Sequence, residues 1–113
     1  MAAARWDIPW DRGGGWRRRL IRKDTTGAVI GIGSPCVMEL RRIYDPSSVA
    51  AAATVTATVD TDGTWADLLA TRELIESLPL ERYQHRIIMP NLVSGEPEVL
   101  ARGYVSIRDT VEG

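Results

Sequence analysis

Polar and apolar residues alternate in the segment Glu81-Arg82-Tyr83-Gln84-His85-Arg86-Ile87-Ile88-Met89. Its residues fall into two alternating sets, with one face carrying Tyr83, His85, Ile87 and Met89 and the other carrying Gln84, Arg86 and Ile88. Successive side chains of a strand point to opposite faces of a sheet, so this alternation predicts a β-strand that turns one face toward a core. Strands elsewhere in the chain are expected to pair with it.

Similar segments lie on both sides of this stretch, separated by turn residues. Further strands are predicted over residues 16–23, 36–44, from about 53 onward, 64–70 and 99–108, with a hairpin turn at 24–27 leading into 28–30. Residues 71–77 are expected to form one or two helical turns with Thr71 as N-cap. About six or seven short strands with one helix indicate a mostly β fold. We expect a small antiparallel β-sandwich or partly closed barrel with one short helix and an extended N-terminal arm.

Two of the other predicted strands also have residues that share one face. Residues expected to share a face are Cys36, Met38, Leu40 and Tyr44 in one strand, and Val99, Ala101, Val105 and Ile107 in the last strand. Turn residues at 45–48 and 60–63 are expected to close the neighbouring strands. We divide the chain into an arm with a glycine hinge, residues 1–15, and a single β domain, residues 16–113.

The arm contains Pro9 and the glycines at 13–15, which disfavour a regular helix. In an extended arm, Trp6, Ile8 and Trp10 lie on one side. Two interpretations stay open, because large aromatic side chains are common both in small cores and at interfaces. Either this stripe docks on a partner protein or the tryptophans fold back onto their own domain. We expect residues 1–12 to be dispensable for folding and necessary for assembly.

Composition places the chain among ordinary globular proteins. It has 113 residues, of which 44% are hydrophobic and 26% charged, and this length suits one domain. No apolar run reaches the roughly 18 residues that cross a bilayer, and the N-terminus has no secretory signal pattern. We expect a soluble protein that is made in a cytoplasm without export and does not bind membranes.

Candidate catalytic groups do not converge in the sequence. Cys36 and His85 are the only cysteine and histidine, so no usual zinc-ligand spacing exists. The acidic pairs at 60 and 62, 73 and 76, and 96 and 98 fall in a turn, a solvated helix and a loop. The glycine-rich run at 27–33 has neither the lysine nor the long helix of a phosphate loop. We predict no enzyme activity and assign no catalytic, cofactor-binding or metal-binding residue.

Charge is distributed unevenly along the chain. Residues 1–23 carry a net charge of +5 and the remainder carries −6, although the whole chain is at −1. The strongest basic run is Trp16-Arg17-Arg18-Arg19-Leu20-Ile21-Arg22-Lys23. We expect either an edge strand whose arginines keep it soluble or pair with acidic neighbours, or a strand that meets an acidic protein partner, in preference to nucleic acid. The predicted partner-binding residues are Trp6, Ile8, Trp10, Arg17 and Arg19.

Four short segments carry a resemblance to a known group of proteins. These are Arg22-Lys23-Asp24-Thr25-Thr26-Gly27, Met38-Glu39-Leu40-Arg41, Thr71 leading to Leu78-Pro79-Leu80-Glu81-Arg82-Tyr83, and Glu98-Val99-Leu100-Ala101-Arg102-Gly103-Tyr104-Val105-Ser106-Ile107. Their order resembles the small β-domains of bacteriophage virions found near the attachment regions of upper-baseplate and tail-fibre proteins. The similarity spans most of residues 16–108.

This resemblance implies a non-enzymatic virion structural protein that docks to other virion proteins and repeats by symmetry, which would make it a homo-oligomer. It could serve as a tail or baseplate protein, a neck adaptor or a capsid decoration protein. The alternative from the residues is a small nucleic-acid-binding β-barrel that uses the basic strand from Trp16 to Lys23. The resemblance names no active site.

Overall fold

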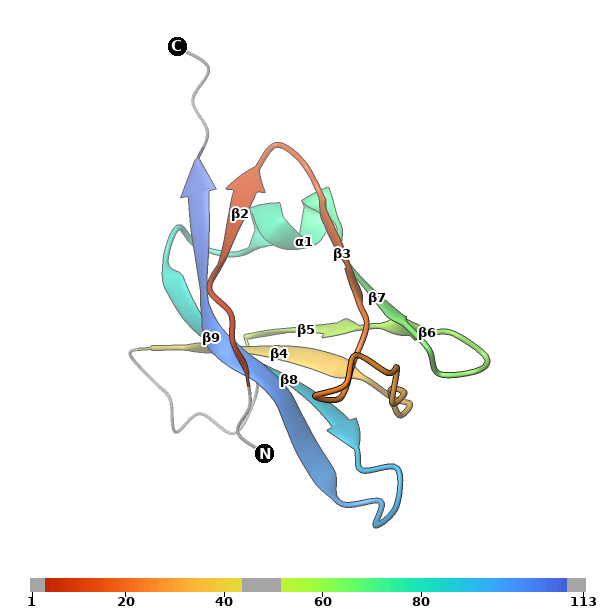
Figure 1. The fold of residues 1–113 in the computed structure, drawn as a ribbon. Helices are drawn as coiled ribbons and strands as arrows, with labels where there is room; N and C mark the ends of the chain where they lie inside the picture. Colours follow the sequence, from red (N-terminus) through yellow and green to blue (C-terminus); the bar gives the residue numbers. More distant parts are fainter. Residues whose placement is uncertain (1–3, 44–51, 110–113) are drawn as a thin grey trace.

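The computed structural model describes residues 4–43 and 52–109, which form two β-sheets and one short helix (Figure 1). The larger sheet has the order β1-β9-β8-β4-β5, and β2 also pairs with β9. Its strands are β1 (Ala4–Arg5), β2 (Ile8–Arg12), β4 (Val37–Arg42), β5 (Ala53–Thr56), β8 (Arg82–Pro90) and β9 (Pro97–Asp109). The smaller sheet has the order β3-β7-β6, with β3 (Trp16–Leu20), β6 (Thr58–Val59) and β7 (Ala66–Ala70). The mostly β prediction is confirmed.

Strand β8 lies at the centre of the larger sheet, antiparallel to both β4 and β9. The face predicted to meet the core is buried at Tyr83, His85, Ile87 and Met89. Strand β4 adds Met38 and Leu40 to the same core, together with Cys36 just before it. The alternation in the sequence therefore predicted these central strands correctly. It is a strong signal, because a shift of one residue in register would turn every apolar side chain to solvent.

The helix α1 (Arg72–Ser77) covers one end of the space between the sheets, near the turn that joins β2 to β3 (Figure 1). Thr71 is its N-cap, as predicted, and its hydroxyl accepts a hydrogen bond from the Leu74 amide at 3.2 Å. Ile75 and Leu78 are buried in the core. The Arg12 guanidinium donates to the Leu78 carbonyl at 2.6 Å, which ties β2 to the end of the helix.

Two local predictions came out differently. Residues 28–30 form no strand of either sheet, and the expected hairpin is reduced to a single bridge between Lys23 and Val29. Val99 does not share the buried face of β9, because the register of β8 and β9 shifts between Ile87 and Ile88. Tyr44 and the turn predicted at 45–48 lie outside the described residues.

The N-terminal arm is extended, as expected, and its strands belong to the larger sheet. Strands β1 and β2 both run parallel to β9, so this edge departs from the antiparallel pattern predicted for the whole fold. Ile8 is 4% exposed and Trp10 is 0% exposed, both within the core. The expectation of an arm dispensable for folding is therefore replaced, because the arm supplies core side chains and pairs with the last strand.

Gly103 of β9 makes this arrangement sterically feasible. Between β1 and β2 the backbone of Trp6 crosses directly over Gly103, and a Cβ placed there would overlap the Trp6 carbonyl oxygen and lie 2.7 Å from Asp7 Oδ1. The Trp6 amide donates to the Arg102 carbonyl at 2.9 Å, and the Tyr104 amide donates to Asp7 Oδ1 at 3.0 Å. The arm is thus fixed on both sides of a residue that has no side chain.

We expect Gly103→Ala to destabilise the protein by about 1–3 kcal/mol, because the added methyl group forces the arm away from β9. Chemical denaturation followed by tryptophan fluorescence measures the change. Gly14→Ala is the matched control, since a Cβ at Gly14 meets nothing within 4 Å. Equal stability of the Gly103→Ala protein and the control would contradict the close approach of the arm.

Candidate interaction surfaces

Three tryptophans close the sandwich where β2 and β3 meet. The ring centroid of Trp16 lies 5.8 Å from that of Trp6 and 5.8 Å from that of Trp10, and both pairs are tilted. Trp10 is fully buried, whereas Trp6 and Trp16 are partly buried at the border of the core. Aromatic pairs at such spacings add to the stabilisation from burial alone. The cluster holds the two sheets together close to the glycine hinge.

His85 fastens the arm from the opposite side. It is paired with Gly103 across β8 and β9, and its Nε2 lies 2.5 Å from the Trp6 carbonyl oxygen. A carbonyl can only accept a hydrogen bond, so Nε2 carries the proton and donates it. Burial lowers the pKa of His85, although the Trp6 carbonyl and the charge of Asp7 act in the opposite direction. His85 is therefore a buried structural histidine.

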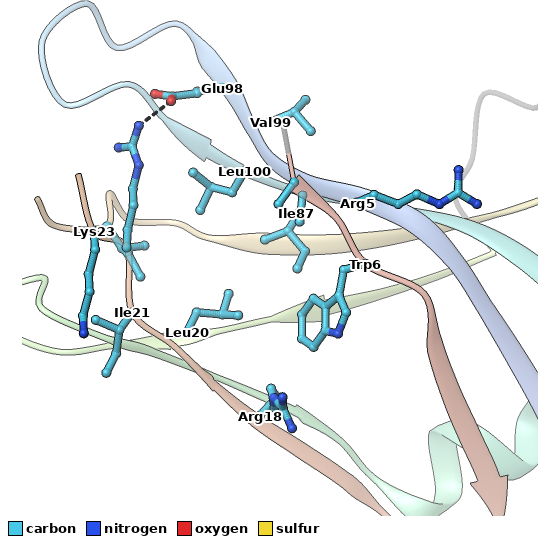
Figure 2. A pocket seen from close by; sticks show the side chains of 14 residues that line it. Arg5, Trp6, Arg18, Leu20, Ile21, Lys23, Ile87, Glu98, Val99 and Leu100 are labelled. Atoms are coloured by element: carbon cyan, nitrogen blue, oxygen red, sulfur yellow. Dashed lines mark hydrogen bonds and ion pairs between the residues drawn. The ribbon is translucent and has the colours of Figure 1, made fainter. Parts of the chain in front are cut away.

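Beyond the tryptophan cluster the two sheets diverge and leave a groove of about 450 Å³. Figure 2 shows Trp6 reaching into it from the arm, Leu20 from the end of β3, and Ile87 and Leu100 from the larger sheet. Ile21, at the rim, is 52% exposed. The groove thus has an apolar floor and one side open to solvent.

A β-bulge supplies part of this floor. Ile87 pairs with Ala101 and Ile88 pairs with Val99, so Leu100 is left without a partner in the ladder. The extra residue changes the alternation of β9, and both Leu100 and Ala101 line the groove. Sequence alternation alone missed this feature, since it assumed an unbroken period of two from Val99 to Ile107.

Cations surround the apolar floor. Arg18 lies over the Trp6 ring, 5.8 Å from its centroid, and Lys23 stands at the far rim. Arg22 is neutralised by Glu98, with a distance of 2.5 Å between Nη2 and Oε2. Arg18 was not among the predicted site residues, but its position was readable, because it shares a strand face with Trp16 and Leu20. The groove therefore combines an apolar interior with a basic edge.

The structure places Arg17 and Arg19 on the opposite face of β3, away from the groove. Both pair with Asp67 at 2.8 Å, and the Arg19 guanidinium stacks on the Trp65 ring at 4.0 Å. Hydrogen bonds from Arg19 and then Arg17 hold the pKa of Asp67 well below its usual range. These two predicted partner-binding arginines are engaged with their own domain, as the edge-strand interpretation proposed.

The three apolar residues of the predicted partner-binding stripe are also divided. Ile8 and Trp10 are core residues, so they offer no surface to a partner in this structure. For Trp10 the structure agrees with the second interpretation of the arm, in which the tryptophans fold back onto their own domain. Trp6 alone lines the groove. The structure brings Trp6 together with Arg18 and Lys23. Neither of these two basic residues was among the predicted partner-binding residues.

Other chemistry in the described part of the chain is sparse. Residues 4–43 and 52–109 contain no group of three or more His, Cys, Asp or Glu side chains that could hold a metal ion. Cys36 is buried, and burial raises the pKa of its thiol to about 11. None of the helices described there is long and apolar enough to traverse a bilayer.

Comparisons with known proteins add no family. No protein-family model and no curated protein sequence matches this chain.

We expect the stability of the protein to fall as the pH is lowered from 7 to 5. The folded-state pKa of His85 is lowered from 6.5 by burial, so the unfolded chain takes up the proton more readily. The loss begins below about pH 6.5 and ends at the folded-state pKa. Aspartates with lowered pKa values, such as Asp67, lose their contribution only below about pH 4.

Urea denaturation at several pH values measures this dependence. His85→Gln keeps a side chain that can donate to the Trp6 carbonyl but does not titrate, so its stability should be flat between pH 7 and 5. If the His85→Gln protein loses as much stability between pH 7 and 5 as the native protein does, His85 does not cause the pH dependence.

We expect Trp10→Ala to cost about 3–5 kcal/mol, because it empties a fully buried position at the junction of the arm and the tryptophan cluster. Thermal and urea unfolding measure the loss. Val93→Ala is the matched control, since Val93 is 97% exposed. A Trp10→Ala protein as stable as this control would mean that the arm is not part of the core.

Proposed function

We propose that this chain is a non-enzymatic structural or assembly protein of a bacteriophage virion, which acts by binding other virion proteins. The observation that carries the proposal is the groove, whose apolar floor of Trp6, Leu20 and Leu100 is open to solvent and which is lined in part by β3. Exposed apolar surface rimmed by charge is typical of protein interaction sites. The resemblance to phage β-domains supports the virion as the setting.

The mode of binding follows from the position of β3. This strand is the terminal strand of the smaller sheet, so one of its backbone edges is unpaired within the described residues. An extended segment of a partner can add to such an edge, while its alternate side chains enter a neighbouring pocket. Here the pocket is the groove, and Arg18 and Lys23 favour a segment with acidic residues next to its apolar ones.

Nucleic-acid binding through the basic strand remains the alternative function. The contacts of β3 give it less support, because Arg17 and Arg19 both pair with Asp67 and the Trp16 ring packs against two other tryptophans. Single-stranded nucleic acid needs aromatic faces on which bases can stack. We expect at most weak, salt-sensitive binding of this kind.

We also propose that the chain has a fixed location and a fixed copy number in the virion. A virion component that repeats by symmetry should be present in a fixed number of copies per particle, in a tail, baseplate, neck or capsid-decoration position. Copies of the chain would then contact one another or a symmetric neighbour. We assign the groove to the binding of a different virion protein.

The test combines particle composition with site-specific crosslinking. Quantitative mass spectrometry of purified virions should find the chain at a constant stoichiometry. A photoreactive amino acid at Ile21, on the groove rim, should crosslink to one virion protein during assembly. The same amino acid at Val93, which is 97% exposed in the loop between β8 and β9 and does not line the groove, is the control and should not select that protein.

Absence of the chain from purified virions would contradict the proposed function. Equal crosslinking from Ile21 and Val93 would instead leave the protein in the virion but exclude the groove as its docking surface.

A further inference from the structure

The outer face of the larger sheet carries a row of arginines at matching positions of adjacent strands. Arg5 of β1 pairs with Arg102 of β9, and Arg102 pairs with Arg86 of β8. Neighbouring strands lie about 4.8 Å apart, so three cationic side chains emerge side by side. Like charges directly opposite each other destabilise a sheet. The row is therefore an unfavourable arrangement in the isolated protein.

Carboxylates compensate this row only at its two ends. Glu39 of β4 accepts a hydrogen bond from Arg86 at 3.1 Å, and Asp7 lies 3.4 Å from Arg5. In the middle, the exposed Arg102 guanidinium makes no hydrogen bond or ion pair with any residue that the structure describes. The charge at the centre of the row is thus left without a counter-ion from the protein itself.

The surroundings reinforce the positive charge. Arg41 and Arg82 lie on the same face, which also contains a shallow depression of about 720 Å³ lined by Arg5, Arg41, Arg86 and Arg102. Against five arginines stand the two carboxylates of Asp7 and Glu39, a local net charge of +3 in a chain whose total is −1. The patch is not evident from the sequence, because its members are distant in the chain and meet only through strand register.

We propose that the arginine row Arg5, Arg102 and Arg86 binds the carboxylates of an acidic segment of a partner protein. The planar guanidinium group can bind a carboxylate through two parallel hydrogen bonds, which lysine cannot do. The inference rests on the proposed function, since it names the chemistry of one protein partner. The surface is separate from the groove, because Arg5 lines the pocket wall but its side chain extends away from the pocket (Figure 2).

The same face fits a nucleic acid less well. Asp7 and Glu39 bracket the row, so a continuous phosphate backbone would meet negative charge at both ends, whereas one or two carboxylates fit between them. Tyr104 is an aromatic residue on this face, and its ring is covered by Arg82 at 4.2 Å and approached by Arg5 at 5.5 Å. The Arg82 guanidinium therefore already occupies aromatic surface on which a base would stack.

The test is an NMR titration of the full chain with an acetylated hexaglutamate peptide, in parallel with a hexathymidine oligonucleotide. We expect the peptide to shift the side-chain Nε–H signals of Arg102 and Arg86 in a saturable way that weakens with salt. Arg102→Gln should lower the peptide affinity about tenfold, since it removes a charged hydrogen-bond donor. Arg108→Gln is the matched control on the same strand, because Arg108 already pairs with Asp11 at 3.0 Å.

A second readout does not need a ligand. Because Arg102→Gln relieves the repulsion within the row, it should raise the melting temperature at low salt, and the difference from the native protein should shrink in concentrated salt. The Arg108→Gln control should not show this rise.

Four results would overturn the inference: no saturable shift of the row with the peptide, equal losses in the two variants, tighter binding of the oligonucleotide, or no rise in melting temperature for Arg102→Gln. If the groove still crosslinks to a virion protein from Ile21, the proposed function stands and this inference alone is lost.

Discussion

The Trp6 carbonyl lies over Gly103 and accepts a hydrogen bond from His85, and this contact fixes the arm to the larger sheet. Three features meet at this point. A glycine in β9 leaves room for the arm, and a histidine in β8 donates a hydrogen bond to it. The Trp6 amide of the arm donates to the Arg102 carbonyl of β9. Each comes from a different part of the chain. Together they convert an extended N-terminal segment into two strands of the larger sheet.

Both surfaces of the molecule follow from this contact. Docking of the arm brings Trp6 and Trp10 against Trp16, which closes the sandwich at the glycine hinge and leaves it open farther along. The opening is the groove. Docking also places Arg5 beside Arg102, which completes the row on the outer face. A chain in which the arm detached would lose the wall of the groove and one end of the arginine row together.

The sequence predicted the parts of this fold that depend on local alternation and turn chemistry. Strand β8, the buried face of β4, and the Thr71 cap were all evident, because burial on one face forces a period of two and a short helix needs a side-chain acceptor at its start. The bulge at Leu100 was not evident, since an extra residue in a ladder leaves no mark in a single sequence. The direction of the arm was also left open, because Trp6 and Trp10 are equally suited to a core and to an interface. The candidate site was less predictable still, because it depends on which strands are neighbours. Arg17 and Arg19 form ion pairs with Asp67 of the adjacent strand, and Arg86 lies opposite Arg102 in the register of β8 and β9.

Native-state hydrogen exchange tests whether the arm is an integral part of the fold. The amide of Trp6 donates to the Arg102 carbonyl, and β2 is paired with β9 along its length. If the arm is an integral part of the fold, the amides of Trp6 and Trp10 should exchange through the same cooperative opening as the amides of β8. If instead they exchange rapidly while β8 stays protected, the arm is a separate, weakly held segment, and the fold does not depend on the contact between Trp6 and Gly103.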